Sequence, residues 1–299
     1  MKLEETKCAI CGRGGRALFS ANDRMNGGKK FNVFKCDNCD LVYVNPRPTT
    51  EDIKSFYPEG YYKNEFLQQG GLVKKLVQWA VDREKRNFVL SVINKKDGAN
   101  LLDIGCGDGR FLNSIRETGF IVYGTDISDE GLRNARKAYG LKNLFKGELK
   151  DARYEEGVFD AITLWTSLEH VHNPLDLLRE VSRVLSKQGA IVLSVPNSAS
   201  LQFRLFRERW FHLDVPRHLY IYSQKSMGML CEKSGLRVLR VFNNNLQLNP
   251  AGWVGSIFGD KNKMINLIFP LLSAIFLPIT LIEGLAFSGG SLTFVIKKL

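Results

Sequence analysis

The stretch Leu101-Leu102-Asp103-Ile104-Gly105-Cys106-Gly107-Asp108-Gly109-Arg110-Phe111-Leu112 joins an apolar strand to a glycine-rich turn that opens a helix. Gly105 and Gly107 allow backbone conformations that a Cβ would penalise, and they let a ligand approach the main chain closely. Asp126 ends the next apolar strand, where a carboxylate suits the two hydroxyls of a ribose. Together these features predict a nucleotide-like cofactor at the turn.

The spacing of the glycines distinguishes between cofactors. A dinucleotide-binding fingerprint reads G-x-G-x-x-G, whereas here the glycines stand at every second position and Arg110 occupies the place of the last one. The sequence therefore predicts no pyrophosphate site. The run instead resembles the first motif of class I S-adenosylmethionine (SAM) methyltransferases, in which the turn approaches the methionine part of SAM and the acid after strand two binds the ribose.

Further segments resemble that family in the same order along the chain. Residues 159–165 resemble its fourth strand, residues 167–174 the loop that follows, and residues 190–195 its fifth strand. Alternating strands and helices predict a mainly parallel sheet covered on both faces, with ligands at the carboxyl ends of the strands. The resemblance implies a Rossmann-like α/β fold with seven strands, of which the last two, expected at 236–243 and 291–297, pair antiparallel.

The resemblance also implies which residues contact SAM. They are Asp103, Gly105, Cys106, Gly107, Asp126, Ile127, Glu148, Leu149 and Trp165. Glu148 stands where the family usually places an aspartate that contacts the adenine amino group, so its longer side chain is a departure from the pattern. An exposed loop glutamate without a ligand is the alternative interpretation of Glu148.

Four of the six cysteines form two closely spaced pairs, Cys8-x2-Cys11 and Cys36-x2-Cys39. Zinc binds four thiolates tetrahedrally, and a segment this short has few other means of holding itself together. Because thiolates would take all four positions, we expect a structural Zn²⁺ rather than a metal that activates water. Two disulfides or free thiols are the alternative.

Two of the four histidines are candidates for catalysis. If the acceptor is a hydroxyl, a neutral imidazole at the cleft can take its proton during methyl transfer. His170 lies in the loop after the expected fourth strand, and His218 lies in residues 210–220, which resemble an acceptor-side segment of bacterial zinc-ribbon methyltransferases. We predict His170 as the first candidate for the base and His218 as a second catalytic residue. Trp210, Asp214 and Arg217 are the predicted acceptor-binding residues. Histidines that only fix their loops are the alternative.

An apolar segment precedes the last expected strand. Residues 264–282 contain no charged side chain, which is just long enough to span a bilayer. A single crossing would place the last two strands on opposite sides of the membrane, where they could not pair. We therefore predict that residues 251–287 form a monotopic hairpin or interfacial helix. Pro270 and Pro278 are places to bend or break it. An oligomer interface or a lid over the acceptor is the alternative. The segment is flanked by lysines, as the cytoplasmic side of a membrane favours, at Lys261, Lys263, Lys297 and Lys298.

Composition limits the partners. Lys and Arg number 42 against 31 Asp and Glu, and a formal net charge of +11 favours an anionic partner such as RNA or a phospholipid surface. The basic residues are scattered, which disfavours nucleic acid. The chain starts without an apolar secretory core, so we expect a cytoplasmic protein that is peripheral on the cytoplasmic face of the membrane.

The predicted domains are a zinc ribbon over residues 1–50, a connector with a lead-in helix over 51–85 and the methyltransferase domain over 86–299, with the apolar insertion at 244–290. The predicted function is SAM-dependent methylation of a hydroxyl on a glycan, lipid-linked sugar or other amphiphilic acceptor. The alternatives are a ribosomal RNA base methyltransferase, a sugar C-methyltransferase and a non-catalytic zinc-ribbon scaffold. The long insertion argues against the first, and the intact glycine turn argues against the last. The oligomeric state stays open.

Overall fold

The centre of the molecule is a seven-stranded sheet with the order β12-β13-β10-β9-β6-β7-β8. The computed structural model describes residues 2–25, 28–57, 72–93, 97–259, 263–286 and 288–299. The strands of this sheet are β6 (Asn100–Ile104), β7 (Ile121–Asp126), β8 (Leu144–Lys146), β9 (Phe159–Trp165), β10 (Leu185–Pro196), β12 (Leu236–Phe242) and β13 (Ser291–Lys298). Strand β13 runs antiparallel between β10 and β12, while the other pairs are parallel. The predicted fold class is thereby confirmed.

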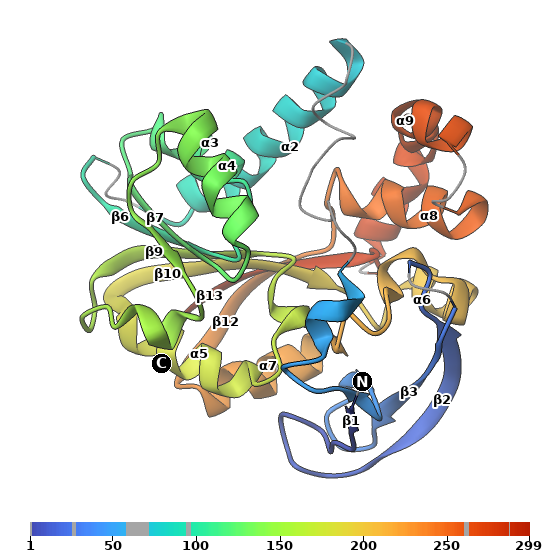
Figure 1. The fold of residues 1–299 in the computed structure, drawn as a ribbon. Helices are drawn as coiled ribbons and strands as arrows, with labels where there is room; N and C mark the ends of the chain where they lie inside the picture. The colour runs from blue at the N-terminus through green and yellow to red at the C-terminus, as the bar shows by residue number, and fades with distance from the viewer. Residues whose placement is uncertain (1, 26–27, 58–71, 94–96, 260–262, 287) are drawn as a thin grey trace.

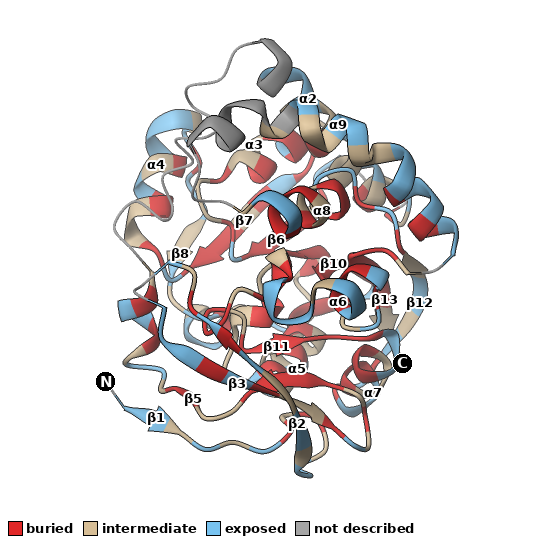
Figure 2. Ribbon diagram, turned by 90° about the vertical axis from the view of Figure 1, so that its right-hand side faces the viewer, coloured by how far each residue is buried: buried red, intermediate tan, exposed pale blue. Residues whose placement is uncertain are grey.

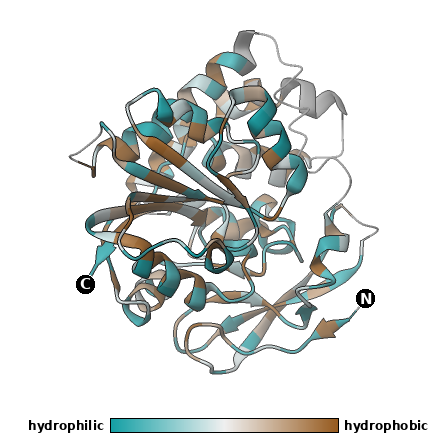
Figure 3. Cartoon of the chain, turned by 60° about the vertical axis from the view of Figure 1, so that its left-hand side comes forward, coloured by the Kyte–Doolittle hydropathy of each residue, from teal (hydrophilic) through white to brown (hydrophobic). Residues whose placement is uncertain are grey.

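Helices cover both faces of this sheet, with α2, α3 and α4 on one face and α5 and α7 on the other (Figure 1). The helices are α2 (Leu72–Leu90), α3 (Arg110–Arg116), α4 (Asp129–Tyr139), α5 (Pro174–Val184), α6 (Leu201–Phe206), α7 (Gln224–Lys233), α8 (Leu248–Phe258) and α9 (Lys263–Leu285). A strand covered on both faces has no water-facing side, which explains the apolar run of β9. Figure 3 shows hydrophobic residues along the strands of the central sheet.

The N-terminal cysteine segment forms a second, four-stranded sheet with the order β11-β4-β3-β2. Its strands are β2 (Gly15–Asn22), β3 (Lys30–Cys36), β4 (Val42–Val44) and β11 (Tyr220–Ile221), and a separate pair is made by β1 (Leu3–Glu4) and β5 (Arg47–Pro48). Strand β11 comes from the methyltransferase part of the chain, and Tyr220 pairs with Tyr43. One cluster of buried side chains continues from Cys8 in this segment to Phe294 in β13. The predicted ribbon therefore shares its sheet and its core with the larger part. Of the predicted connector, residues 58–71 lie outside the described residues.

The apolar insertion forms α8 and α9, which pack against each other beside the central sheet (Figure 2). The expected break at Pro270 or Pro278 is wrong, because α9 is one helix from Lys263 to Leu285. A bend at either proline stays a prediction. A proline removes one main-chain N–H, and contacts with α8, such as the stacked rings of Trp253 and Phe276, support the helix around it. None of the helices in the described part of the chain combines the length and apolar character needed to cross a bilayer.

The basic chain end does not flank this insertion in space. Strand β13 starts at Ser291 near α8 and α9 and carries Lys297 and Lys298 to the opposite side of the molecule (Figure 1). Eight extended residues cover roughly 25 Å, so these two lysines lie well away from α8 and α9. That they lie on the cytoplasmic side stays a prediction. Lys261 lies outside the described residues.

Candidate active site

The glycine turn between β6 and α3 has the backbone conformation and the space that a bound cofactor needs. Gly105, Gly107 and Gly109 have φ angles of +75°, +52° and +73°. A Cβ on Gly105 would lie 2.4 Å from Oγ of Ser167, which follows β9. No described atom lies within 4 Å of a Cβ built on Gly107. The turn therefore requires glycine and has open space in front of it, which fits the methionine part of SAM.

Asp126 fixes the shape of this turn. Its Oδ2 accepts a hydrogen bond from the Gly107 amide at 2.8 Å, and its Oδ1 accepts one from the Ser128 amide at 2.7 Å. Each carboxylate oxygen keeps a lone pair, which is what two ribose hydroxyls would use. The predicted ribose-binding residue thus lies beside the glycine turn, at the carboxyl end of β7.

Asp103 is buried at the centre of the sheet, where its Oδ1 accepts a hydrogen bond from Oγ1 of Thr163 at 2.7 Å. Burial raises the pKa of the Asp103 carboxyl to about 7 even though Thr163 and Lys85 favour its charged form.

The Lys85 ammonium lies 5.2 Å from the ring centroid of Trp165. The indole N–H of Trp165 is buried without a partner among the described residues, so it can donate to a ligand.

Helix α2 contributes residues to this site that the sequence analysis missed. Lys85 faces Trp165, and Asp82 pairs with Nε of Arg110 at 3.4 Å across the start of α3. The sequence contains a sign of this arrangement, because Asp82 and Lys85 are three positions apart and so lie on one face of a helix. That pattern is equally typical of a solvent-exposed face, so the sequence alone predicted only a lead-in helix.

The remaining residues predicted to bind SAM occupy different environments. Cys106 is buried and its sulfur packs toward Gly124, so this residue offers the turn only its main chain. Ile127 is 55% exposed, whereas Leu149 is buried. Glu148 is exposed and its carboxylate lies 2.8 Å from Nζ of Lys150. A contact between Glu148 and adenine stays a prediction.

Three titratable side chains meet where β9 ends. Glu169 and His170 follow β9, His218 comes from the loop before β11, and their ligand atoms lie within 4.8 Å of one another. The imidazole rings of His170 and His218 pack edge to face with centroids 4.7 Å apart. Both predicted catalytic histidines therefore lie in one place, although 48 positions separate them in the sequence.

Hydrogen bonds fix the tautomer of both rings. Nδ1 of His218 donates to the carbonyl of His212 at 2.8 Å, and Nδ1 of His170 donates to the carbonyl of Arg217 at 3.0 Å. The hydroxyl of Tyr57 also lies 3.1 Å from Nδ1 of His170. Each neutral ring therefore keeps its lone pair on Nε2. Burial lowers the pKa of His218 to about 3 and also lowers that of His170. Both imidazoles are consequently neutral at physiological pH, and burial makes them weaker bases than a free imidazole.

The three predicted acceptor-binding residues make internal contacts. Arg217 is fully buried and bonds both oxygens of Asp214, at 3.0 and 2.6 Å. Trp210 is also fully buried, with its indole N–H directed at Oε1 of Gln202. These contacts hold the loop that carries His218. Direct binding of an acceptor by these residues stays a prediction.

The four N-terminal cysteine sulfurs converge on one point. Sγ of Cys8 lies 3.3 Å from that of Cys39, Sγ of Cys11 lies 3.5 Å from that of Cys36, and all four lie within 4.8 Å of one another. Sulfurs around tetrahedral zinc lie about 3.8 Å apart, given Zn–S bonds of about 2.3 Å. No disulfide joins these cysteines. The residue set therefore fits a Zn(Cys)4 site.

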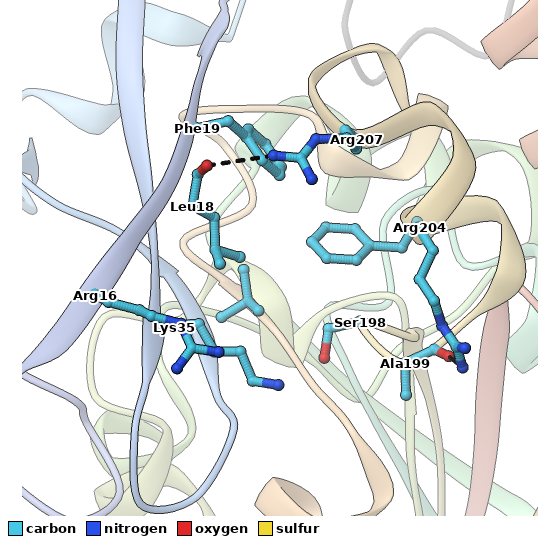
Figure 4. Close-up of a pocket in the computed structure, with 10 residues that line it drawn as sticks. Arg16, Leu18, Phe19, Lys35, Ser198, Ala199, Arg204 and Arg207 are labelled. Atoms are coloured by element: carbon cyan, nitrogen blue, oxygen red, sulfur yellow. Dashed lines mark hydrogen bonds between the residues drawn. The ribbon is translucent and has the colours of Figure 1, made fainter.

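A basic groove of about 430 Å³ lies between the N-terminal sheet and α6 (Figure 4). It opens beyond the carboxyl end of β10, the strand that pairs with β9. Carboxylates partly neutralise two of its cations, since Arg16 lies 3.4 Å from Asp37 and Lys35 lies 3.1 Å from Asp40. Its lining residues are Arg16, Leu18, Phe19, Lys35, Val42, Ser198, Ala199, Phe203, Arg204 and Arg207.

The strand order, the glycine turn and the acid after β7 together define an α/β protein of the class I methyltransferase type. A family model described as "Methyltransferase domain" matches residues 78–241, more than half of the chain. The chain therefore belongs to the methyltransferase-domain family, which implies SAM as its cofactor.

Known relatives cover only part of the chain. The chain is 32% identical over 114 residues to a protein named ubiquinone biosynthesis O-methyltransferase from Xanthomonas oryzae, covering 36% of this chain and 47% of the relative. It is 24% identical over 202 residues to a protein of the same name from Bordetella avium, covering 61% and 80%. The chain thus spans about half the length of the curated relatives that it matches at 30% identity or more.

Solved structures support the fold. A SAM-dependent methyltransferase from Archaeoglobus fulgidus superimposes with a TM-score of 0.53 at 17% identity, covering 81% of this chain and all of that one. At this level of identity the similarity establishes the architecture.

Proposed function

We propose that this protein transfers a methyl group from SAM to a hydroxyl of an anionic, amphiphilic acceptor such as a lipid-linked sugar. The observation that carries the proposal is the pair of neutral imidazoles of His170 and His218 in and beside the loop that follows β9. The contact between Gly105 and Ser167 places the start of this loop against the turn. A hydroxyl must lose a proton as it is methylated, and these rings can accept one.

Methyl transfer from a sulfonium is an in-line displacement, so most of the rate gain comes from alignment of donor and acceptor. The main chain at Gly105 and Gly107 and the carboxylate of Asp126 would hold the donor. The loop of residues 210–220 would hold the acceptor through the shape set by Arg217 and Trp210. His170 stays our first candidate for the base, and His218 the second.

The basic groove supports an anionic group on the acceptor. Arg204 donates a hydrogen bond to the carbonyl of Ala199 at 2.8 Å, and Arg207 donates one to the carbonyl of Leu18 at 3.4 Å. Both arginines line the groove in Figure 4. A guanidinium held in this way still has donors for a phosphate or carboxylate. A sugar phosphate has both the anion and the hydroxyl that this arrangement would require.

The exposed face of α9 supports an amphiphilic acceptor and a membrane surface. Its solvent side carries Leu271, Ile275, Ile279, Ile282 and Leu285, which are 42 to 77% exposed. The charged residue Glu283 lies instead on the buried side, where Trp253 and Gln202 donate to its Oε2. An apolar stripe of this kind suits the interface of a phospholipid bilayer, and the positive net charge favours anionic lipids.

We also propose that Cys8, Cys11, Cys36 and Cys39 hold a structural Zn²⁺. The metal would fix the two turns that support β2 and β3. Since all four positions are thiolates, the ion would take no part in methyl transfer.

The test is transfer of labelled methyl from SAM to three fractions of the source cell, namely a lipid extract, a water-soluble extract and total RNA. We expect label in the lipid fraction, and His170→Ala should lower its amount while SAM binding persists. Label in RNA alone would instead favour the ribosomal alternative. No label in any fraction, and no heat of SAM binding in calorimetry, would leave the scaffold alternative.

A further inference from the structure

We propose that Glu169, His170 and His218 form a second metal site, which binds a zinc-like divalent cation at the end of β9. This site is separate from the four cysteines. It consists of one carboxylate and two imidazoles, with the ligand atoms within 4.8 Å of one another. Two histidines and one acid are a common ligand set for catalytic zinc, which keeps a fourth position open.

The carboxylate of Glu169 is the strongest observation for a missing ligand. Glu169 is fully buried, and neither of its side-chain oxygens accepts a hydrogen bond from another side chain or from the main chain of another described residue. Buried carboxylates are expensive unless they are paired or bind a metal. Nε2 of His218 lies 4.0 Å from Oε1 of Glu169, which is beyond hydrogen-bond range.

The geometry of that gap suits an ion between the two groups. Zinc holds oxygen and nitrogen ligands at about 2.0–2.2 Å, so two ligands of one ion lie roughly 3–4 Å apart. The separation between Nε2 of His218 and Oε1 of Glu169 is at the upper end of this range. Only a small movement of either side chain would therefore be required.

The surroundings of the histidines match those of metal ligands. A ligating imidazole usually donates its other N–H to a carbonyl or carboxylate, which fixes the ring and the tautomer. The carbonyls of His212 and Arg217 accept from Nδ1 of His218 and of His170, respectively. The side chain of His218 is 12% exposed, so the cluster is not sealed from solvent.

The role of the metal rests on the proposed methylation of a hydroxyl, whereas its binding does not. With zinc bound, Nε2 of both histidines would hold the metal, so the metal would replace the imidazole as the group that activates the acceptor. A hydroxyl bound at the open position would have a lowered pKa and would release its proton to water. The resulting alkoxide oxygen would form a bond to the methyl carbon of SAM. The bond between that carbon and sulfur would break with its electron pair passing to sulfur, which leaves the neutral thioether S-adenosylhomocysteine.

The experiment measures zinc bound per chain by dialysis of the chelator-treated protein, residues 1–299, against Zn²⁺. We expect the native chain to take up a second equivalent beyond that held by the cysteines. Glu169→Gln and His218→Gln should weaken binding of this equivalent more than about tenfold and keep the first. His172→Gln is the matched control, because Nε2 of His172 contacts the Pro48 carbonyl at 3.1 Å, and it should keep both.

Retention of the cysteine-bound equivalent and a normal heat of SAM binding identify folded variants. A native chain that binds only the cysteine equivalent at saturating Zn²⁺ overturns the proposal, and so does Glu169→Gln with unchanged uptake. If the second equivalent binds but no cell fraction accepts methyl, the metal site stands and the proposed function fails. If methyl transfer occurs but the chain binds no second equivalent of zinc, the proposed function stands and the second metal site fails.

Discussion

Arg217 and Asp23 lie 194 positions apart in the sequence and form an ion pair in which neither side chain is exposed, with Nη1 and Oδ1 3.0 Å apart. The same Nη1 donates to the carbonyl of Phe56 at 2.9 Å, and Asp214 binds the rest of the guanidinium. One side chain therefore joins the N-terminal segment to the loop that carries His218. The two parts are linked by this group as well as by strand β11.

Arg217→Met should lower the free energy of unfolding by about 3–5 kcal/mol, because it leaves the buried carboxylate of Asp23 and the largely buried carboxylate of Asp214 without their cation. Urea unfolding at neutral pH measures the change. Arg179→Met is the control, since Arg179 and Asp176 form an exposed pair that contributes at most about 1 kcal/mol. Equal losses for the two variants would show that the buried pair has no special importance.

The sequence predicted the central sheet well because its signals are local. An apolar run such as Phe159–Trp165 and a turn with glycine at positions 105 and 107 each specify their own conformation, and the strand order then follows from the family pattern. The spacing of the cysteine pairs is local in the same sense, and the structure brings all four sulfurs together.

Contacts between distant segments could not be predicted in this way. Arg217 stands in a motif that resembles an acceptor-side segment, yet its charge is neutralised by Asp23, whose position relative to it depends on the whole fold. The sequence predicted a lead-in helix here, but not that Lys85 of α2 lies beside Trp165. Proline frequency likewise gives a tendency to break helices, and packing against α8 overrides it in α9.

Gly105→Ala should weaken SAM binding at least about tenfold, because the new Cβ requires an unfavourable φ of +75° and collides with Ser167. Calorimetry measures the affinity. Gly140→Ala is a matched control at the end of α4, with a φ of +62° but no described atom within 4 Å of its Cβ. It should lower stability and bind SAM normally. Weakened binding in both variants would point to a general loss of stability.

Cys8→Ser should abolish the cysteine-bound zinc and lower the melting temperature by more than about 5 °C. The effect should appear as one transition, since the N-terminal sheet shares its core with the larger part. Metal analysis and calorimetry give the two readings. Cys231→Ala, at a buried cysteine outside the cluster, should keep the metal. A Cys8→Ser protein with native zinc content contradicts the assignment.

Replacing Ile275 and Ile282 together by Asp should reduce flotation of the protein with vesicles that contain phosphatidylglycerol. The two side chains are 62 and 66% exposed on one face of α9, and a charge there opposes insertion into the interface. Leu239→Asp, on β12 and 44% exposed, is the control and should float as the native chain does. A native chain that stays with the buffer but forms dimers would favour the oligomer interface.

Glu84→Gln should alter how stability depends on pH. Both oxygens of Glu84 accept from the Leu246 amide, at 3.1 and 3.2 Å, which holds α2 against the segment before α8. Burial raises the pKa of this carboxyl from 4.5 to about 7, although the Leu246 bond favours the charged form. The folded protein therefore binds more protons than the unfolded chain between these values, and stability contributed by Glu84 is lost as the pH rises through 7.

The amide of glutamine accepts the same hydrogen bond and does not ionise, so Glu84→Gln should match the native chain at pH 4. At pH 8 it should be more stable by about 1–2 kcal/mol, a value reduced for the partial exposure of the site. Urea unfolding at both pH values measures the difference. Glu117→Gln, at an exposed position after α3, is the control and should show no such gain. If the stability of the native chain and that of Glu84→Gln change by the same amount between pH 5 and pH 8, ionisation of Glu84 costs the folded state nothing. In that case α2 lies farther from residue 246 in solution than the structure shows.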